Sequence, residues 1–158
     1  MLKVGALAPE FTAQDQHGKT LTLGSLLERG RLVLYFYPRD FTPVCTAQAC
    51  TFRDASPDLS ELSANVVGVS GDALDSHQRF SNEHQVPFSL IADPERRIIK
   101  PYGAMLPIIH HTLRVTYVIG TDRRILGVFH HELSAAKHLA DVKRLLEAER
   151  PTNVAAEK

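Results

Sequence analysis

Apolar residues occur in short clusters along the chain, and their spacing predicts alternating strands and helices. The continuous apolar run at residues 32–37 is typical of a strand buried on both faces of a sheet, and residues 65–70 are expected to form a second buried strand. Residues 88–91 are expected to form a third, shorter strand. Residues 114–119 and 125–130 flank a turn-forming segment, and this arrangement predicts a hairpin.

Helices are predicted between and after these strands. The segments of helical composition or spacing are residues 26–29, 42–53, 57–62, 73–84, part of 93–103 and 134–149. Ser25 is expected to cap the first of them. The alternation predicts an α/β domain, in which a central mixed β-sheet is covered by helices on both faces. With 158 residues, we expect one domain over 1–150 and a frayed tail over 151–158.

Composition narrows the possible partners and compartments. Lys and Arg total 18 and Asp and Glu total 18, so the formal net charge is zero. This balance argues against nucleic acid or an anionic membrane as a dominant partner. No apolar run approaches the roughly 18 residues of a membrane span. The first residues lack the apolar stretch of a signal peptide, so we expect a cytoplasmic protein.

Two cysteines, Cys45 and Cys50, follow the first buried strand. Two are too few for a disulfide scaffold or a cysteine-rich zinc site. A close pair in a cytosolic protein favours redox chemistry. In open α/β sheets, ligands bind beyond the carboxyl ends of strands, which is where these cysteines are expected.

The start of the next helix favours an anionic form of Cys45. Thr42 is a good N-cap residue and Pro43 suits the first helical position, so Cys45 falls at the third. Unpaired amides and the positive end of the helix dipole stabilise a thiolate there. The thiolate is the reactive form of cysteine. The alternative is that both cysteines are ordinary buried small residues.

Cys50 lies five positions further along the same predicted helix. An ideal helix separates such Cα atoms by roughly 8–9 Å. A disulfide requires Cα atoms within about 7 Å. A Cys45–Cys50 bond therefore cannot form in an intact helix, and the first turns would have to unwind.

The segment YFYPRDFTPVCTAQACTFRD, residues 35–54, resembles the peroxiredoxins. The motif P-x-x-x-[TS]-x-x-C appears as Pro38, Thr42 and Cys45. The resemblance extends to the opening G-x-x-A-P-x-F, to P-F-S-L-I-A-D and to R-V-T-Y-V-I, which begins at Arg114. The chain is most similar to the Q-type branch, also called bacterioferritin comigratory proteins.

The resemblance implies a thioredoxin-like fold and a thiol peroxidase that acts on hydrogen peroxide and organic hydroperoxides. Cys45 would be oxidised to a sulfenic acid and Cys50 would condense with it to a disulfide. Thioredoxin or a similar dithiol would reduce that bond. Thr42 would hydrogen-bond the peroxide or thiolate, Pro38 would shield the sulfur from water, and Arg114 would stabilise the developing charge. The resemblance implies no cofactor or metal, and we expect a monomer or weak homodimer.

Two other functions remain open at this point. A thiol–disulfide oxidoreductase on the same fold usually carries C-x-x-C, whereas this chain has a four-residue gap. A non-enzymatic redox-sensing or metal-binding module would use the pairs His110-His111 and His130-His131. Neighbours on an extended chain point to opposite faces, so neither pair chelates easily.

Overall fold

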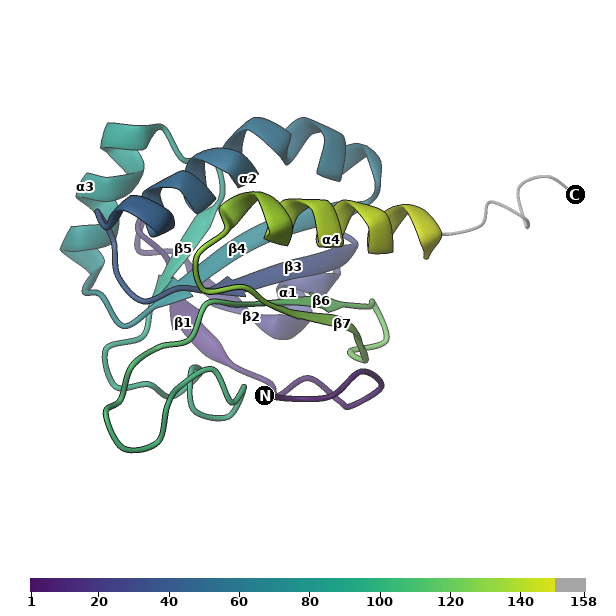
Figure 1. The fold of residues 1–158 in the computed structure, drawn as a ribbon, viewed down its shortest axis with the longest axis horizontal. Helices are drawn as coiled ribbons and strands as arrows, with labels where there is room; N and C mark the ends of the chain where they lie inside the picture. Colours follow the sequence, from purple (N-terminus) through teal and green to yellow (C-terminus); the bar gives the residue numbers. More distant parts are fainter. Residues whose placement is uncertain (150–158) are drawn as a thin grey trace, which may run out of the picture.

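The computed structural model describes residues 1–149, in which strands and helices alternate and a hairpin and a last helix follow (Figure 1). The elements are β1 (Thr12–Gln14), β2 (Thr20–Thr22), α1 (Leu23–Leu27), β3 (Arg31–Phe36), α2 (Pro43–Glu61), β4 (Ala64–Ser70), α3 (Leu74–His84), β5 (Ser89–Ala92), β6 (Val115–Ile119), β7 (Ile125–His130) and α4 (Ala135–Ala148). The predicted tail over 151–158 lies outside the described residues.

A five-stranded mixed sheet has the order β5-β4-β3-β6-β7. Strands β3, β4 and β5 are parallel to one another, whereas β6 is antiparallel to both β3 and β7. All six residues of β3 are buried, which explains why its sequence is a continuous apolar run. The predicted mixed α/β sheet and its hairpin are confirmed.

The two faces of the sheet carry different layers. Helices α2 and α4 cover one face, and α3 lies beside α2 near the edge strand β5 (Figure 1). Residues alternate along β3, so that Val33 and Tyr35 face these helices. Leu34 and Phe36 face the other side, where α1, the β1–β2 hairpin and irregular chain pack. Helices thus cover both faces, although α1 supplies only five residues on the second.

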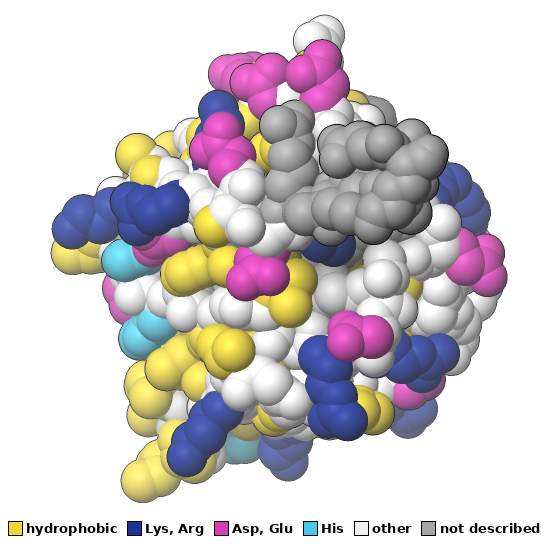
Figure 2. Space-filling model, turned by 90° about the vertical axis from the view of Figure 1, so that its right-hand side faces the viewer, with side chains coloured by type: hydrophobic (Ala, Val, Ile, Leu, Met, Phe, Trp, Pro, Cys, Tyr) yellow, Lys and Arg dark blue, Asp and Glu magenta, His cyan; other side chains and the backbone are white. Residues whose placement is uncertain are grey.

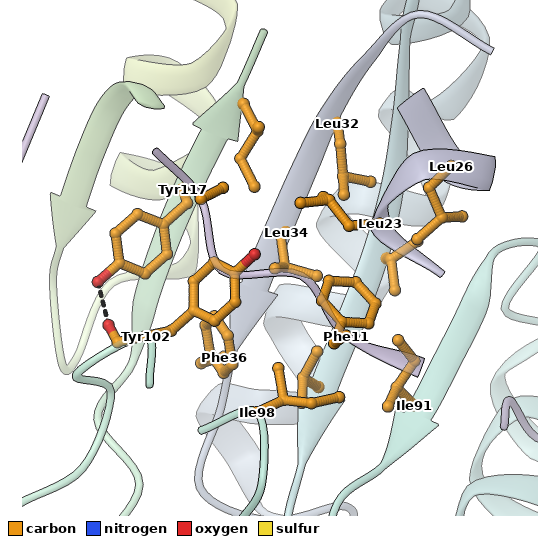
Figure 3. Close-up of a cluster of buried hydrophobic side chains, with 14 of the residues drawn as sticks. Phe11, Leu23, Leu26, Leu32, Leu34, Phe36, Ile91, Ile98, Tyr102 and Tyr117 are labelled. Atoms are coloured by element: carbon orange, nitrogen blue, oxygen red, sulfur yellow. Dashed lines mark hydrogen bonds between the residues drawn. The ribbon is translucent and has the colours of Figure 1, made fainter. Parts of the chain in front are cut away.

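The second face holds a core rich in aromatic residues (Figure 3). The ring of Tyr102 packs against Phe11, Phe36 and Tyr117. The Tyr117 hydroxyl donates to the carbonyl of Tyr102 and accepts from the backbone N–H of Leu2 at 3.0 Å. These contacts fix the irregular segment over the sheet without a long helix.

The first helix begins earlier than predicted. Thr22, not Ser25, is the N-cap of α1, and the Thr22 hydroxyl accepts from the N–H of Ser25 at 3.0 Å. The Ser25 hydroxyl in turn accepts from the N–H of Thr22, which completes a capping box. Ser25, which was expected to be the N-cap, is therefore the third residue of the helix.

The two predicted helices over 42–53 and 57–62 form one continuous helix, α2, with Pro57 inside it. The prediction of a break was wrong because Pro57 is exposed, and water can hydrate the backbone carbonyl that loses its N–H partner there. Phe52, Ala55 and Leu59 keep the apolar face of α2 buried on both sides of the proline. Packing thus outweighs the local cost of the proline.

Residues 93–103 form consecutive turns with two helix-type hydrogen bonds, from the N–H of Lys100 to the carbonyl of Arg96 and from that of Tyr102 to Ile98, but no regular helix. The buried carboxylate of Asp93 accepts from the backbone N–H groups of Arg97, Ile98 and Ile99 at 2.8–2.9 Å. Burial raises the pKa of Asp93, and these three hydrogen bonds oppose that rise. The Asp93 side chain therefore accepts from backbone N–H groups that would otherwise donate to carbonyls within a helix.

At the end of the sheet where β3 begins, Arg31 joins the ends of α2 and α4. Its guanidinium donates to the carbonyl of Leu62, and to those of Glu149 at 2.8 Å and Leu146 at 3.3 Å. The surface at this end mixes charges of both signs with scattered hydrophobic side chains (Figure 2). Within residues 1–149, no helix has the length and apolar character needed to cross a membrane.

Candidate active site

Helix α2 starts shortly after β3 ends, so its first turn lies at the carboxyl edge of the parallel strands (Figure 1). Thr42 is the N-cap, Pro43 is the first helical residue and Cys45 is the third, as the sequence predicted. Only 1% of Cys45 is exposed. Its sulfur therefore lies near the unpaired N–H groups of the helix start, in surroundings that largely exclude water.

Arg114 reaches Cys45 from the other half of the chain. Because β6 is antiparallel to β3 and Val115 pairs with Phe36, Arg114 lies just beyond the end of β3. Its Nη1 donates to Cys45 Sγ at 3.2 Å, and the side chain is buried. The structure thus places a buried positive charge in contact with the sulfur.

Two residues hold the arginine in this position. The Glu132 carbonyl accepts from Arg114 Nε at 2.8 Å, and the Glu132 carboxylate accepts from the Arg114 backbone N–H at 2.9 Å. Gln48 Oε1 accepts from the same Nη1 at 3.0 Å, so one nitrogen serves both Gln48 and Cys45. Burial raises the pKa of Glu132, but hydrogen bonds from Arg114 and His130 outweigh it and lower that pKa overall. Sequence reasoning missed Glu132, since no local motif marks it.

Thr42 and Pro38 lie in the connection between β3 and α2. The Thr42 hydroxyl donates to the carbonyl of Arg39 at 2.8 Å and does not cap the helix, although Thr42 occupies the N-cap position. Both Thr42 and Pro38 are half-buried. The hydroxyl oxygen of Thr42 keeps its acceptor capacity, because its proton is used by Arg39.

Cys50 lies in the same uninterrupted helix as Cys45, and both thiols are free. Cys50 is half-buried, whereas Cys45 is buried. The requirement that α2 unwind before a bond can form between them therefore applies to this structure.

Two buried polar atoms near the site lack a hydrogen-bond partner within residues 1–149: Gln48 Nε2 and the Tyr35 hydroxyl. Arg114 can only donate, so it fixes Oε1 of Gln48 toward itself and leaves Nε2 unpaired. Burial raises the pKa of Tyr35 well above its usual value, and the nearby Asp40 adds to the shift. Tyr35 therefore stays neutral beside the cysteines.

A set of three metal-ligating side chains occurs once among residues 1–149, at Asp40, Asp72 and His77, whose ligand atoms lie within 4.8 Å of one another. These groups already bond to one another and to nearby hydroxyl and backbone groups. The paired histidines are used separately: His130 contacts Glu132, and His131 contacts Asp141, each at 2.6 Å. The arrangement favours a polar network over a metal site.

Comparison with known proteins agrees with this geometry. Residues 4–128 match the AhpC/TSA family. The chain is 37% identical over 147 residues to "Peroxiredoxin Q, chloroplastic" of Populus jackii, covering 91% of this chain and 68% of that protein. It is 35% identical to the Sedum lineare protein of the same name, covering 91% and 77%. The chain thus spans about two thirds to three quarters of these relatives' lengths.

Solved structures show the same fold. Peroxidoxin BcpB from Mycobacterium tuberculosis has a TM-score of 0.91 and 32% identity, covering 96% of this chain and 100% of that one. Peroxiredoxin Q from Xanthomonas campestris has a TM-score of 0.84 at 23% identity, covering 96% and 98%. The fold and the buried cysteine at the start of α2 define a thioredoxin-fold thiol peroxidase, that is, a peroxiredoxin. The chain belongs to the AhpC/TSA family, and it is similar to proteins named peroxiredoxin Q.

Proposed function

We propose that Cys45 is the peroxide-reactive thiol. The observation that carries this is the 3.2 Å contact between Arg114 Nη1 and the buried Cys45 Sγ. The thiolate attacks the terminal oxygen of ROOH, the S–O bond forms and the O–O bond breaks. The RO⁻ leaving group takes a proton and departs as ROH, which is water when the substrate is hydrogen peroxide. Cys45 is thereby oxidised to a sulfenic acid.

Arg114, Thr42 and Pro38 assist this step in the proposal. Arg114 balances the negative charge that moves from sulfur to the leaving oxygen. Thr42 offers a hydroxyl oxygen at the helix start, which accepts a hydrogen bond from a peroxide OH. Pro38, which is half-buried in the β3–α2 connection, limits the contact of the sulfur with water in this proposal.

Cys50 resolves the sulfenic acid in the proposed cycle. Its thiol attacks Cys45 Sγ, the S–O bond breaks and water leaves, so an intramolecular disulfide forms. The first turns of α2 unwind for this step, since both residues start in one helix. Thioredoxin or a similar dithiol then reduces the disulfide by exchange and is itself oxidised.

Intact mass measurement after one equivalent of hydrogen peroxide tests the proposal. The reduced parent should lose about 2 Da, and neither Cys45→Ser nor Cys50→Ser should show that loss. A gain of about 16 or 32 Da on Cys45 of the parent would contradict the assignment of Cys50 and favour an external thiol. An unchanged mass with free thiols would contradict the peroxide-reactive role of Cys45.

We also propose a cytoplasmic location and a monomeric or weakly dimeric state. The absence of a spanning helix within residues 1–149 is consistent with the location, while the plant relatives are named chloroplastic. Fractionation of the native cells and sedimentation of the purified chain test the two statements separately. Recovery in an organelle, or a stable higher oligomer, would contradict them.

A further inference from the structure

The turn that precedes α2 is held by groups on and before α3. The Asp40 carboxylate is completely buried and accepts from the Ser76 hydroxyl at 2.8 Å and the Tyr37 hydroxyl at 2.7 Å. Its backbone N–H donates to the carboxylate of Asp72 at 2.8 Å. The mechanism proposed above uses none of these groups.

Asp40 also forms a buried pair with His77. His77 Nδ1 lies 2.7 Å from Asp40 Oδ2, and His77 Nε2 lies 3.0 Å from the carbonyl of Ile91. A carbonyl can only accept, so Nε2 carries a hydrogen. Nδ1 and Oδ2 therefore share the remaining proton. With the Tyr37 hydroxyl on Oδ1 and the Ser76 hydroxyl and His77 ring on Oδ2, both oxygens of the buried Asp40 side chain have hydrogen-bond partners.

Phe41 adds an apolar contact to the same helix. Its backbone has φ of 66°, in the left-handed region that a bulky residue seldom adopts. Its ring packs edge-on against Phe80, with centroids 5.2 Å apart, and the Arg79 guanidinium lies 5.9 Å from the ring centroid. Local preference does not favour this turn, so its conformation depends on the contacts with α3.

Helix α3 contacts the chain again after Cys50. Arg53 Nη1 donates to the carbonyl of His84, the last residue of α3, at 2.8 Å. Phe52 is fully buried in the core beside it. The segment 42–51, which contains both cysteines, is therefore fixed at each end by contacts that include α3.

We propose that Asp40 and His77 are positioning residues that hold the turn before α2 on α3, and so set how easily segment 42–51 unwinds. The inference rests on the proposed two-cysteine cycle. The folded start of α2 places Cys45 beside Arg114 for the attack on peroxide. The disulfide step requires instead that the start of α2 unwinds, because the two sulfurs cannot meet in the intact helix. Loosening the turn therefore slows the first step and speeds the second.

Two rate constants measured separately test this inference. The first is sulfenic acid formation in a Cys50→Ser background, followed by rapid quench and intact mass, because the chain contains no Trp to serve as a fluorescent reporter. The second is disulfide formation in the chain with both cysteines. Asp40→Ala should slow the first at least about tenfold, because small displacements in a reacting site cost this much or more. The same variant should speed the second about threefold or more, since local opening becomes easier.

Conservative and control variants separate positioning from general stability. Asp40→Asn still accepts from Tyr37 and can donate to His77 Nδ1, but it gives up the bond from Ser76, so both rates should change less than in Asp40→Ala. Arg31→Met weakens the opposite end of the sheet and should not produce opposite changes in the two steps. Ser76→Ala removes one donor to Asp40 and gives a milder form of the same split if Asp40→Ala fails to fold.

Hydrogen exchange provides a readout that does not depend on peroxide chemistry. In the reduced protein, Asp40→Ala or Ser76→Ala should speed amide exchange in segment 42–51 and leave α4 unchanged. Two rates that fall by the same factor, or that stay at parent values with unchanged exchange, would overturn the inference. If the parent itself does not react with peroxide, the proposed function fails, and the exchange result still decides whether Asp40 holds the segment.

Discussion

Arg114 donates to Cys45 although 69 residues separate them in the sequence. The contact follows from topology, because β6 runs antiparallel to β3 and its first residue pairs with Phe36. Glu132, just beyond the end of the neighbouring strand β7, then accepts from both the backbone and the side chain of Arg114. The pairing of β3, β6 and β7 thus determines the surroundings of the Cys45 thiol, although Cys45 itself belongs to helix α2.

Replacing Arg114 by lysine should strongly slow the reaction of Cys45 with hydrogen peroxide. A lysine has one nitrogen and cannot satisfy Cys45, Gln48 and Glu132 together. We expect the second-order rate constant to fall about 100-fold, as for the loss of a well-placed charge-stabilising group. Competition for peroxide against a reference thiol measures it. Arg124→Lys, at an exposed position, is the control, and a rate equal to the parent's in Arg114→Lys would contradict the proposed role.

Loss of the hydroxyl group should affect the free energy of unfolding differently at Tyr35 and at Tyr37. The Tyr35 hydroxyl is buried and has no partner within residues 1–149, so Tyr35→Phe should preserve the free energy of unfolding or raise it by up to about 1 kcal/mol. The Tyr37 hydroxyl donates to Asp40, so Tyr37→Phe should lower it by about 1–3 kcal/mol. Equilibrium urea unfolding measures both. Equal losses in the two variants would mean that Tyr35 has a partner.

His138 should make the protein less stable in mild acid. Its Nδ1 is paired with the Thr116 hydroxyl and its Nε2 with the carbonyl of His131, each at 2.8 Å, which fits a neutral ring. Burial lowers the pKa of His138 from 6.5 to about 4. The unfolded chain therefore binds a proton at higher pH than the folded one, and stability is lost as the pH falls from 6.5 toward about 4.

The total loss attributable to His138 is about 3 kcal/mol once the pH is below both pKa values. Urea unfolding at a series of pH values should show this slope in the parent and a flatter profile in His138→Gln. An identical slope in both proteins would assign the acid sensitivity to other groups.

Arg31 should contribute to stability through backbone carbonyls rather than through an ion pair. Arg31→Met would leave the carbonyls of Leu62 and Glu149 without this donor at the ends of two helices. We expect the free energy of unfolding to fall by about 2–4 kcal/mol. Thermal or urea unfolding checks this, with Arg29→Met as the exposed control. Similar values for the two variants would show that other groups satisfy these carbonyls.

The sequence predicted those elements whose pattern is local. The apolar run that became β3 and the hairpin of β6 and β7 needed no knowledge of distant residues. Pro57 misled the prediction of α2, because a proline is compatible with a helix when its ring is exposed and the opposite face is packed. The N-cap of α1 was predicted at Ser25, but Thr22, three residues earlier, also carries a capping hydroxyl and is the N-cap in the structure.

The residues of the candidate site likewise fall into those that the local sequence predicts and those that it does not. The placement of Thr42 and Cys45 at the start of a helix could be predicted from adjacent residues. Arg114 was expected only through the family resemblance, and Glu132 was not expected at all, because their contacts depend on strand register. Asp40 and His77 are 37 residues apart and carry no joint motif. Their pairing follows only from the parallel alignment of β3, β4 and β5.

The distance along the chain between Cys45 and Arg114 also has a consequence during synthesis. At about 5–20 residues per second, the ribosome adds the arginine roughly 3–14 s after the cysteine. Throughout that interval Arg114 has not been added, so the nascent thiol lacks the guanidinium contact of the folded protein. In the proposed cycle, Cys45 therefore becomes reactive late, when β6 pairs with β3, and the unfinished chain is spared oxidation at this residue.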